Sequence, residues 1–336
     1  MYFDIVMPLT LFLVTIVTTF LNDKVEGKFK GVFEGKEFGN LNAVVLVVAM
    51  SITISLMVFV PQMAIMTIFL FAYSMVLFIF TYLFSDFQKA KVQLFCLVFL
   101  VASFAAAIFN LFNYWTDNTS VYGTLAFFSL FGFTLASLVY EEKRVAKGER
   151  WYLAVLPSAL FILLYVFFSR TPIWFPYLLD TYGIVFAILI ILYLGSVFTW
   201  KTTLIFVGAL TVMDVILVLI TGTMVSAART VSALRLPVLV SLPTLPTINT
   251  DWGLIYMSLG LGDFFFAGLI SIQTMKRFGR RFAILSIIAM TLSFFIFESL
   301  ILTYELAAFP GTLMLICGWL PLMVLKLLVR FVQRRN

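Results

Sequence analysis

The sequence contains no histidine, only two cysteines and few charged side chains. Of its 336 residues, 11% are charged, against roughly 25% in an ordinary soluble domain. The absence of histidine excludes histidine-based catalytic triads, histidine metal ligands and histidine proton relays. Cys96 and Cys317 both lie within apolar segments, so the sequence predicts no disulfide framework.

Apolar residues make up 63% of the chain. So few charges cannot cover that much apolar surface in water, which predicts a membrane protein with several spans. A spanning helix takes roughly 20 residues, so the apolar residues suffice for about ten or eleven spans. The segments are continuously apolar, unlike the alternating strands of a membrane barrel. The predicted fold class is therefore all-α, a polytopic transmembrane helical bundle.

The apolar segments divide the chain into three predicted parts. Residues 1–115 would hold the N-terminal transmembrane helices, 116–200 connecting transmembrane helices, and 201–336 the C-terminal catalytic transmembrane helices. We expect the segment 122–140, which is short and rich in glycine and phenylalanine, to be a partial span. The candidate spans are 3–21, 42–61, 64–84, 93–115, 122–140, 151–169, 178–199, 202–222, 253–275, 282–304 and 310–331.

The basic residues predict the orientation in the membrane. If all the candidate spans cross the bilayer, every one of the 22 Lys and Arg residues except Arg170, Arg229 and Arg235 falls on one side. Cytoplasmic loops carry such an excess. We therefore expect the N-terminus outside and the C-terminus in the cytoplasm. The net charge of +6 then reflects these loops, and we expect no nucleic-acid partner.

The segment 223–251 is unlike the others because Pro237, Pro243 and Pro246 exclude a regular spanning helix. One interpretation is a re-entrant or interfacial segment. The other is a gate or a substrate-docking strand, because the stretch beginning at Leu236 and Pro237 is apolar and β-rich, which suits pairing with an extended peptide.

Acidic residues inside apolar segments are the main functional signal. Asp214, Asp263 and Glu298 lie well within such segments, whereas Asp4 and Asp180 lie near segment ends, where we expect water to solvate them. An ionised carboxylate in hydrocarbon costs roughly 2.5–3.5 kcal/mol on insertion scales. Residues of this kind normally face a protein interior or a water-filled cavity.

Asp214 and Asp263 together have the chemistry of an aspartic protease. Neither has a basic residue in its own segment, so the two should share protons rather than both ionise. A dyad that holds one proton can activate water with one carboxylate and protonate the peptide oxygen with the other. This reaction needs no metal and no cofactor, and we expect none. Gly260 and Gly262 would let the helix of Asp263 approach its neighbour closely.

Other hypotheses use the same residues. The acids could serve a proton- or cation-coupled transporter or a leak channel, although we find no inverted repeat of the transporter kind. A prepilin-type peptidase would place its first aspartate near the cytoplasm, whereas Asp214 lies in mid-segment. Glu298 is interpreted as an interhelical partner of Thr303 or Tyr304, or alternatively as a group that modulates the proton of the dyad.

The motif Gly260-Leu261-Gly262-Asp263, about 50 residues after a mid-span aspartate and before two final spans, resembles that of the GxGD intramembrane aspartyl proteases. Presenilin and signal peptide peptidase are members. The stretch MDVILVL resembles the first catalytic motif of that family, and AAFPGTLMLI falls where the family carries Pro-Ala-Leu. The resemblance implies nine core spans, with one or two more here, the surplus lying around 116–200.

Carried over to this chain, the resemblance implies that Asp214 and Asp263 are the catalytic pair. Pro310, Gly311 and Thr312 would pack beside them and help to place the substrate. Met213 stands where the family usually has tyrosine, so the hydrogen bond of that hydroxyl is missing.

The expected partners are transmembrane helical peptide substrates and membrane lipid. The predicted orientation is that of signal peptide peptidase, which implies type II single-span substrates or leftover signal peptides. The absence of a long luminal domain favours a minimal prokaryote-type homologue that acts without accessory subunits.

Overall fold

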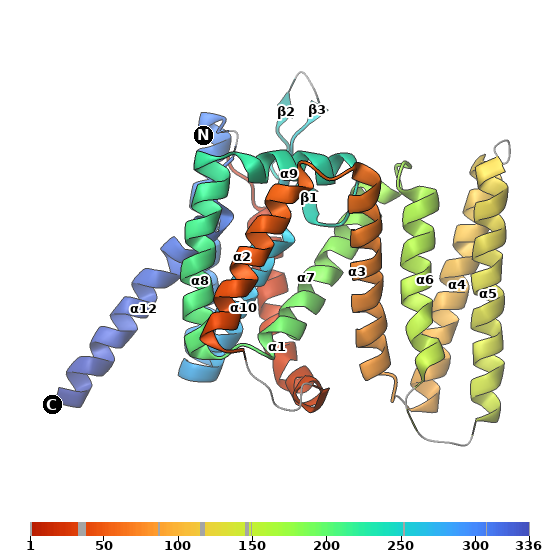
Figure 1. The fold of residues 1–336 in the computed structure, drawn as a ribbon, viewed down its shortest axis with the longest axis horizontal. Helices are drawn as coiled ribbons and strands as arrows, with labels where there is room; N and C mark the ends of the chain where they lie inside the picture. Colours follow the sequence, from red (N-terminus) through yellow and green to blue (C-terminus); the bar gives the residue numbers. More distant parts are fainter. Residues whose placement is uncertain are drawn as a thin grey trace. The chain divides into compact units, whose positions relative to one another are not determined.

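The computed structural model describes residues 2–32, 38–86, 88–114, 118–144, 148, 150–250, 253–306 and 308–335. Over these ranges the chain is mainly helical, with four short strands (Figure 1). Ten of the described helices are long and apolar enough to cross a membrane. A multi-pass bundle of membrane helices is thus confirmed, and the number of nine core spans stays a prediction.

The chain divides into two compact units. The first unit comprises Met1–Gln62 and Leu179–Asn336, and the second unit comprises Met63–Leu178. This division follows spatial contacts, and the three sequence ranges given above stay a prediction.

The second unit is a helical bundle whose core is aromatic and aliphatic. Val92, Cys96, Phe127, Leu156 and Phe168 are buried together in it. The helix over the glycine- and phenylalanine-rich segment has 26 residues, so the expectation of a partial span was wrong. Its glycines do not break it, because the segment has no proline and packs along the preceding helix. The elements are α3 (Gln62–Leu83), α4 (Lys89–Tyr114), α5 (Asn118–Lys143), α6 (Trp151–Phe168) and the π-turn η1 (Trp174–Leu178).

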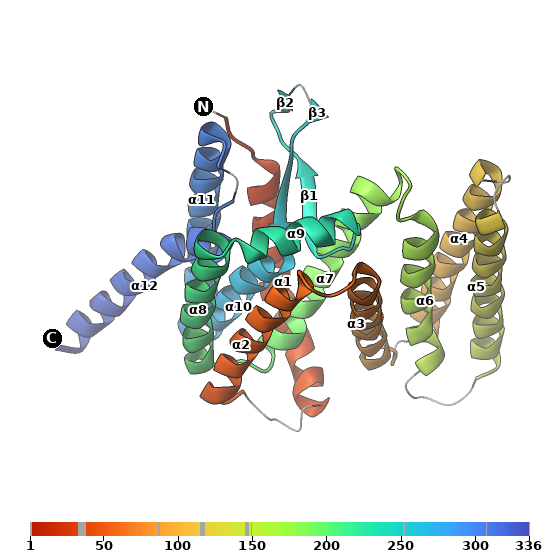
Figure 2. The ribbon, with the colours of Figure 1, turned by 45° about the horizontal axis from the view of Figure 1, so that its top comes forward.

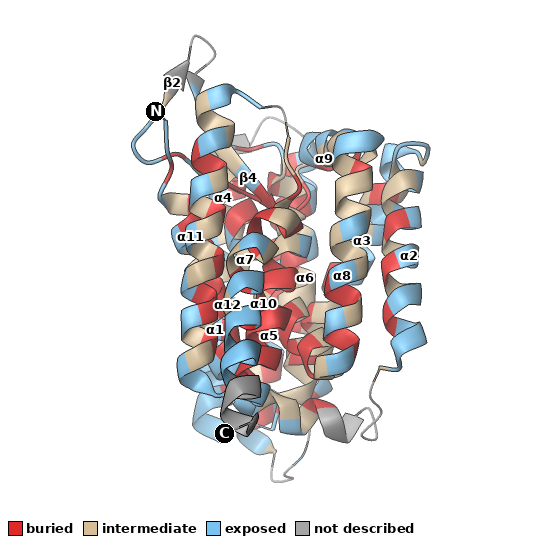
Figure 3. Ribbon diagram, turned by 90° about the vertical axis from the view of Figure 1, so that its left-hand side faces the viewer, coloured by how far each residue is buried: buried red, intermediate tan, exposed pale blue. Residues whose placement is uncertain are grey.

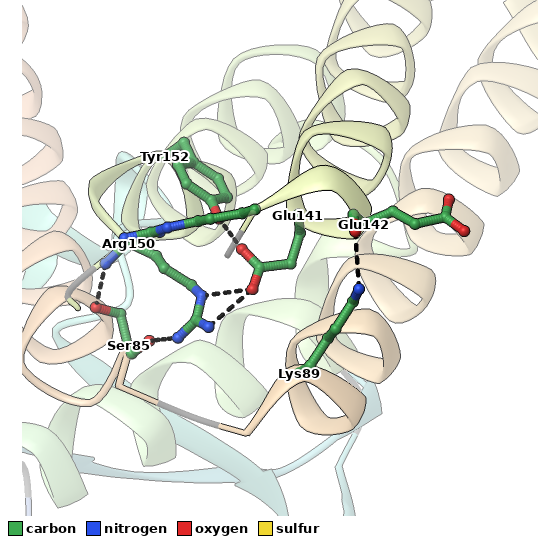
Figure 4. A network of polar contacts seen from close by, with 7 residues as sticks. Ser85, Lys89, Glu141, Glu142, Arg150 and Tyr152 are labelled. Carbon is green, nitrogen blue, oxygen red and sulfur yellow. Dashed lines mark hydrogen bonds and ion pairs between the residues drawn. The ribbon is translucent and has the colours of Figure 1, made fainter. Parts of the chain in front are cut away.

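A buried ion pair closes one end of the second unit (Figure 4). Arg150 donates from Nε to Oε1 of Glu141 over 2.9 Å, and its Nη1 donates to the carbonyl of Ser85 over 2.9 Å. Tyr152 donates its hydroxyl hydrogen to the other oxygen of Glu141. The hydrogen bond to Glu141 raises the pKa of the Arg150 guanidinium above its usual value. This network ties the α3–α4 connection to the α5–α6 connection.

The first unit is built around a central buried helix, α10. All residues from Phe264 to Met275 are buried in this helix (Figure 3), which packs against α1, α7, α8, α11 and α12. Gly268 permits the approach of α7, because a β-carbon there would stand 2.6 Å from Cγ2 of Ile191. The elements are α1 (Val6–Val32), α2 (Asn40–Met57), α7 (Leu179–Gly195), α8 (Trp200–Val215), the π-turn η2 (Ile216–Ile220), α9 (Thr223–Ala233), α10 (Leu261–Phe278), α11 (Arg280–Tyr304) and α12 (Gly311–Arg335).

Strands replace helix in the segment before α10. Strand β1 (Leu239–Pro243) pairs antiparallel with β4 (Tyr256–Gly260), and β2 (Asn249–Thr250) pairs with β3 (Gly253–Leu254). The predicted span 253–275 was therefore wrong in its first part, since α10 begins only at Leu261. The backbone of β1 supplies the hydrogen-bond partners that a helix would otherwise supply internally. The predicted β-rich stretch does form a strand, and α9 lies across the bundle end beside it (Figures 1 and 2).

Basic residues gather at the other end of α10. Lys276 pairs with Glu26 over 2.9 Å, and Arg280 pairs with Asp23 over 3.3 Å. Between them Gly279 has a φ of +89°, which joins α10 to α11 at a conformation that favours glycine. These ion pairs bring the end of α1 beside the α10–α11 turn, at the opposite end of α10 from the strands.

Candidate active site

Asp263 lies in the first turn of α10, directly after strand β4. Gly260 precedes the helix in an extended conformation, and Leu261 fixes the junction by donating its N–H to the carbonyl of Val238 over 3.0 Å. A helix N-terminus favours a carboxylate, because its free N–H groups carry partial positive charge. The strand-to-helix junction therefore positions Asp263, in contrast to the mid-helix position expected from the sequence.

Asp214 lies on α8, one residue before the last residue of this helix, and η2 follows directly. Its Oδ2 accepts two hydrogen bonds from Thr312, from the hydroxyl over 2.6 Å and from the backbone N–H over 3.1 Å. Thr312 belongs to the first turn of α12, where the backbone N–H groups have no partner within the helix. The start of α12 thus fixes the side chain of Asp214.

Gly311 brings the second carboxylate to the same place. A β-carbon on residue 311 would stand 2.6 Å from Cγ and 2.8 Å from Oδ2 of Asp263, closer than real β-carbons come. Two consecutive residues, Gly311 and Thr312, therefore contact the two aspartates separately. The buried Pro310 begins the turn, since its carbonyl accepts the N–H of Met314 over 3.3 Å. The structure thus brings together Asp214, Asp263 and the Pro-Gly-Thr loop.

A cavity of about 770 Å³ lies in front of both carboxylates. Its wall includes residues of α8, α9, α11, α12 and both long strands, all within the first unit. The aliphatic and aromatic part of the wall includes Leu259 and Phe294, and the polar part includes Ser258. A cavity of this size and mixed lining is within the range of ligand-binding sites.

Both strands of the pair contribute residues to the wall of this cavity. The backbone N–H of Ser241 points away from β4 and donates to Asp180, at the start of α7, over 2.7 Å. Asp180 therefore covers the outer edge of β1 at this residue. The hydrogen bonds that join the strands alternate, so the backbone groups of Ser258 in β4 point away from β1. Among the described strands β4 has no second neighbour.

The remaining predicted site residues lie around this centre rather than on it. Met213 is half-buried on α8, next to Asp214. Leu236 and Pro237 precede β1 and are buried. The cavity is bordered by Leu239, the first residue of β1, rather than by these two residues. A β-carbon on Gly262 would meet open space, so the idea that this glycine permits close helix approach was wrong.

Asp4 and Asp180 are buried, so the expectation that water solvates them was wrong. Asp4 accepts N–H groups of Met7 over 3.0 Å and of Leu245 over 2.8 Å. Backbone donors at the start of α1 and in the strand region take the place of water for these two carboxylates. Both therefore anchor the strand region to helices.

Glu298 on α11 borders the same cavity as the two aspartates. Its predicted partners were wrong: Thr303 donates its hydroxyl hydrogen to the backbone carbonyl of Tyr2, and Tyr304 is exposed. Glu298 itself is 0% exposed, and within the described ranges neither carboxylate oxygen has a hydrogen-bond partner. Sequence reasoning recognised this acid as anomalous but could not place it, because spacing along the chain does not reveal which helix faces the cavity.

No family model matches this chain, and no curated protein or solved structure matches it either.

Proposed function

We propose that this protein is an intramembrane aspartyl endopeptidase with Asp214 and Asp263 as its catalytic dyad, related to the GxGD proteases. The observation that carries the proposal is the start of α12. There Thr312 binds Asp214 and the adjacent Gly311 contacts Asp263, so carboxylates from two helices meet at one cavity.

In this mechanism the two carboxylates share one proton, because the charges of two ionised neighbours would repel each other. The ionised carboxylate removes a proton from water, and that water attacks the peptide carbonyl carbon. The protonated carboxylate donates to the carbonyl oxygen as the tetrahedral intermediate forms. Collapse of the intermediate breaks the C–N bond and protonates the leaving amine.

The edge of β4 that does not pair with β1 would hold the substrate during this reaction. A helical peptide bond is shielded by its own hydrogen bonds, so the substrate must be extended before water can attack it. Pairing with β4 supplies backbone hydrogen bonds to an extended segment. Because β4 runs directly into the first turn of α10, the paired segment would lie beside Asp263.

The charges favour an orientation with the N-terminus outside and the C-terminus in the cytoplasm. In the first unit the basic cluster of Lys276 and Arg280 lies at the opposite end of α10 from Asp263. The positive-inside rule then places the dyad nearer the outer face. Type II single-span proteins and leftover signal peptides would be the substrates, with membrane lipid around the helices.

Cleavage of a single-span peptide by purified protein tests the proposal. We expect Asp214→Asn and Asp263→Asn each to reduce cleavage to background, while Glu142→Gln, a substitution at an exposed position of the second unit, retains it. Mass spectrometry of the products would locate the cleaved bond. Undiminished cleavage by either aspartate variant would contradict the proposal. Ion flux into liposomes that both variants abolish, without proteolysis, would favour the transporter or channel alternative.

A further inference from the structure

Glu298 is a buried acid that the proposed reaction does not use. Glu298 is one of the residues that border the cavity, its carboxylate oxygens are buried, and among the residues that the structure describes neither oxygen has a hydrogen-bond partner. An ionised group in this position is costly unless a cation or a set of donors accompanies it. The acid therefore either carries a proton or awaits a partner from outside the chain.

Contacts between α11 and α12 place Glu298 at the depth of the dyad. The two helices are antiparallel neighbours, and the hydroxyl of Ser293 donates to the carbonyl of Met314 over 2.7 Å. Further along, the rings of Phe297 and Phe309 stack with centroids 5.3 Å apart. This register puts Glu298 level with the turn that leads into Gly311, and hence level with the aspartates.

The charged groups around Glu298 are mostly acidic. Asp214, Asp263 and Glu305 border the same cavity, and Asp4 is close enough for its charge to act on Glu298. Arg229, the basic residue bordering the cavity, is exposed on α9. A cavity with this balance attracts a cation more strongly than an anion.

We propose that Glu298 is a specificity-determining residue that binds a basic side chain of the substrate next to the scissile bond. This inference rests on the proposed peptidase function. A lysine or arginine within a membrane segment is itself costly to bury, so pairing with Glu298 satisfies both groups at once. An apolar side chain at the same substrate position leaves the carboxylate unpartnered and gains nothing from it.

The test uses matched single-span peptides that carry Lys, Gln or Leu at each position flanking the scissile bond in turn. Cleavage gives kcat/KM for each peptide, and fluorescence anisotropy gives Kd. At one position we expect the wild type to prefer Lys over Leu by about tenfold or more, the range of a charge-assisted hydrogen bond. Glu298→Gln should lose this preference while still cleaving the Leu peptide. The matched variant Glu142→Gln should keep it.

Charge reversal gives an independent readout. Glu298→Lys should prefer a peptide with Glu at the same position, which a merely structural role for Glu298 would not produce. Equal Lys-to-Leu ratios in the wild type and in Glu298→Gln would overturn the inference, and so would a Gln peptide as good as the Lys peptide.

The binding measurement separates this inference from the proposed function. If the wild type cleaves no peptide but binds the Lys peptide more tightly through Glu298, the peptidase function fails and recognition by Glu298 stands. If the wild type cleaves the peptides without any Lys preference, recognition by Glu298 fails and the peptidase function stands.

Discussion

Glu141 in the second unit and Glu298 in the first are both buried glutamates on long apolar helices, and they differ in their partners. Glu141 accepts hydrogen bonds from Arg150 and Tyr152 (Figure 4). Glu298, by contrast, has no partner within the described chain and borders a cavity. Burial alone therefore does not identify a functional acid. An acid whose oxygens accept hydrogen bonds from the chain stabilises the fold, whereas a buried acid without such donors beside a cavity is a candidate for binding a ligand group.

The polar groups around these two glutamates differ in the same way. In the second unit the guanidinium of Arg150 binds both Ser85 in the α3–α4 connection and Glu141 at the end of α5, so its donors stabilise the fold. In the first unit the polar groups of Asp214, Asp263 and Ser258 face one cavity. Substitutions in the first case should change stability, and substitutions in the second should change activity.

The largest effect on stability should come from Glu141→Gln. This change leaves the Arg150 guanidinium buried without its counter-ion, and breaking a buried ion pair from one side costs about 3–5 kcal/mol. Glu298→Gln should cost little or stabilise the protein, because it removes an unpartnered acid. Chemical unfolding in detergent would measure both. A loss for Glu298→Gln equal to that for Glu141→Gln would break the comparison, and Glu142→Gln controls for the substitution itself.

On the proposed peptidase function, Gly311→Ala should reduce kcat by about 100-fold, the cost of displacing a catalytic group by about 1 Å. The new β-carbon would push against the carboxylate of Asp263, from whose Cγ it would stand 2.6 Å. Gly208→Ala on α8 is the matched control, because a β-carbon there meets open space. Peptide cleavage and unfolding should be measured together. A variant that unfolds readily but retains its kcat would place Gly311 with the structural residues instead.

Thr312→Val should have the smallest effect, a loss in kcat of about tenfold. It removes the hydroxyl donor to Asp214, a hydrogen bond to a charged group, and leaves the backbone N–H bond in place. Thr312→Ser keeps the donor and should retain most of the activity. If the valine and serine variants behave alike, the hydroxyl does not position the dyad.

Several features could be predicted from the sequence because they depend on local chemistry. Continuous apolar runs predict membrane helices, and the prolines after residue 236 predict a break in the helical pattern with a strand beside it. The start of α10 could not be predicted, because residues 253–260 are apolar enough for a span. Residues 256–260 form strand β4 instead, because β1 supplies the backbone hydrogen-bond partners. The burial of Asp4 and Asp180 was missed for a related reason, since Leu245 and Ser241, which donate to them, are distant in sequence and become neighbours only in the fold.

By itself the sequence determined that this chain is a helical membrane protein and that Asp214, Asp263 and Glu298 are anomalous acids, since a charge within an apolar segment is costly wherever that segment packs. The tertiary structure decided that both acids meet the start of α12 and that Glu298 borders the same cavity. Those contacts join residues far apart along the chain. They depend on which helix faces which, and helix packing rather than local sequence sets that relation.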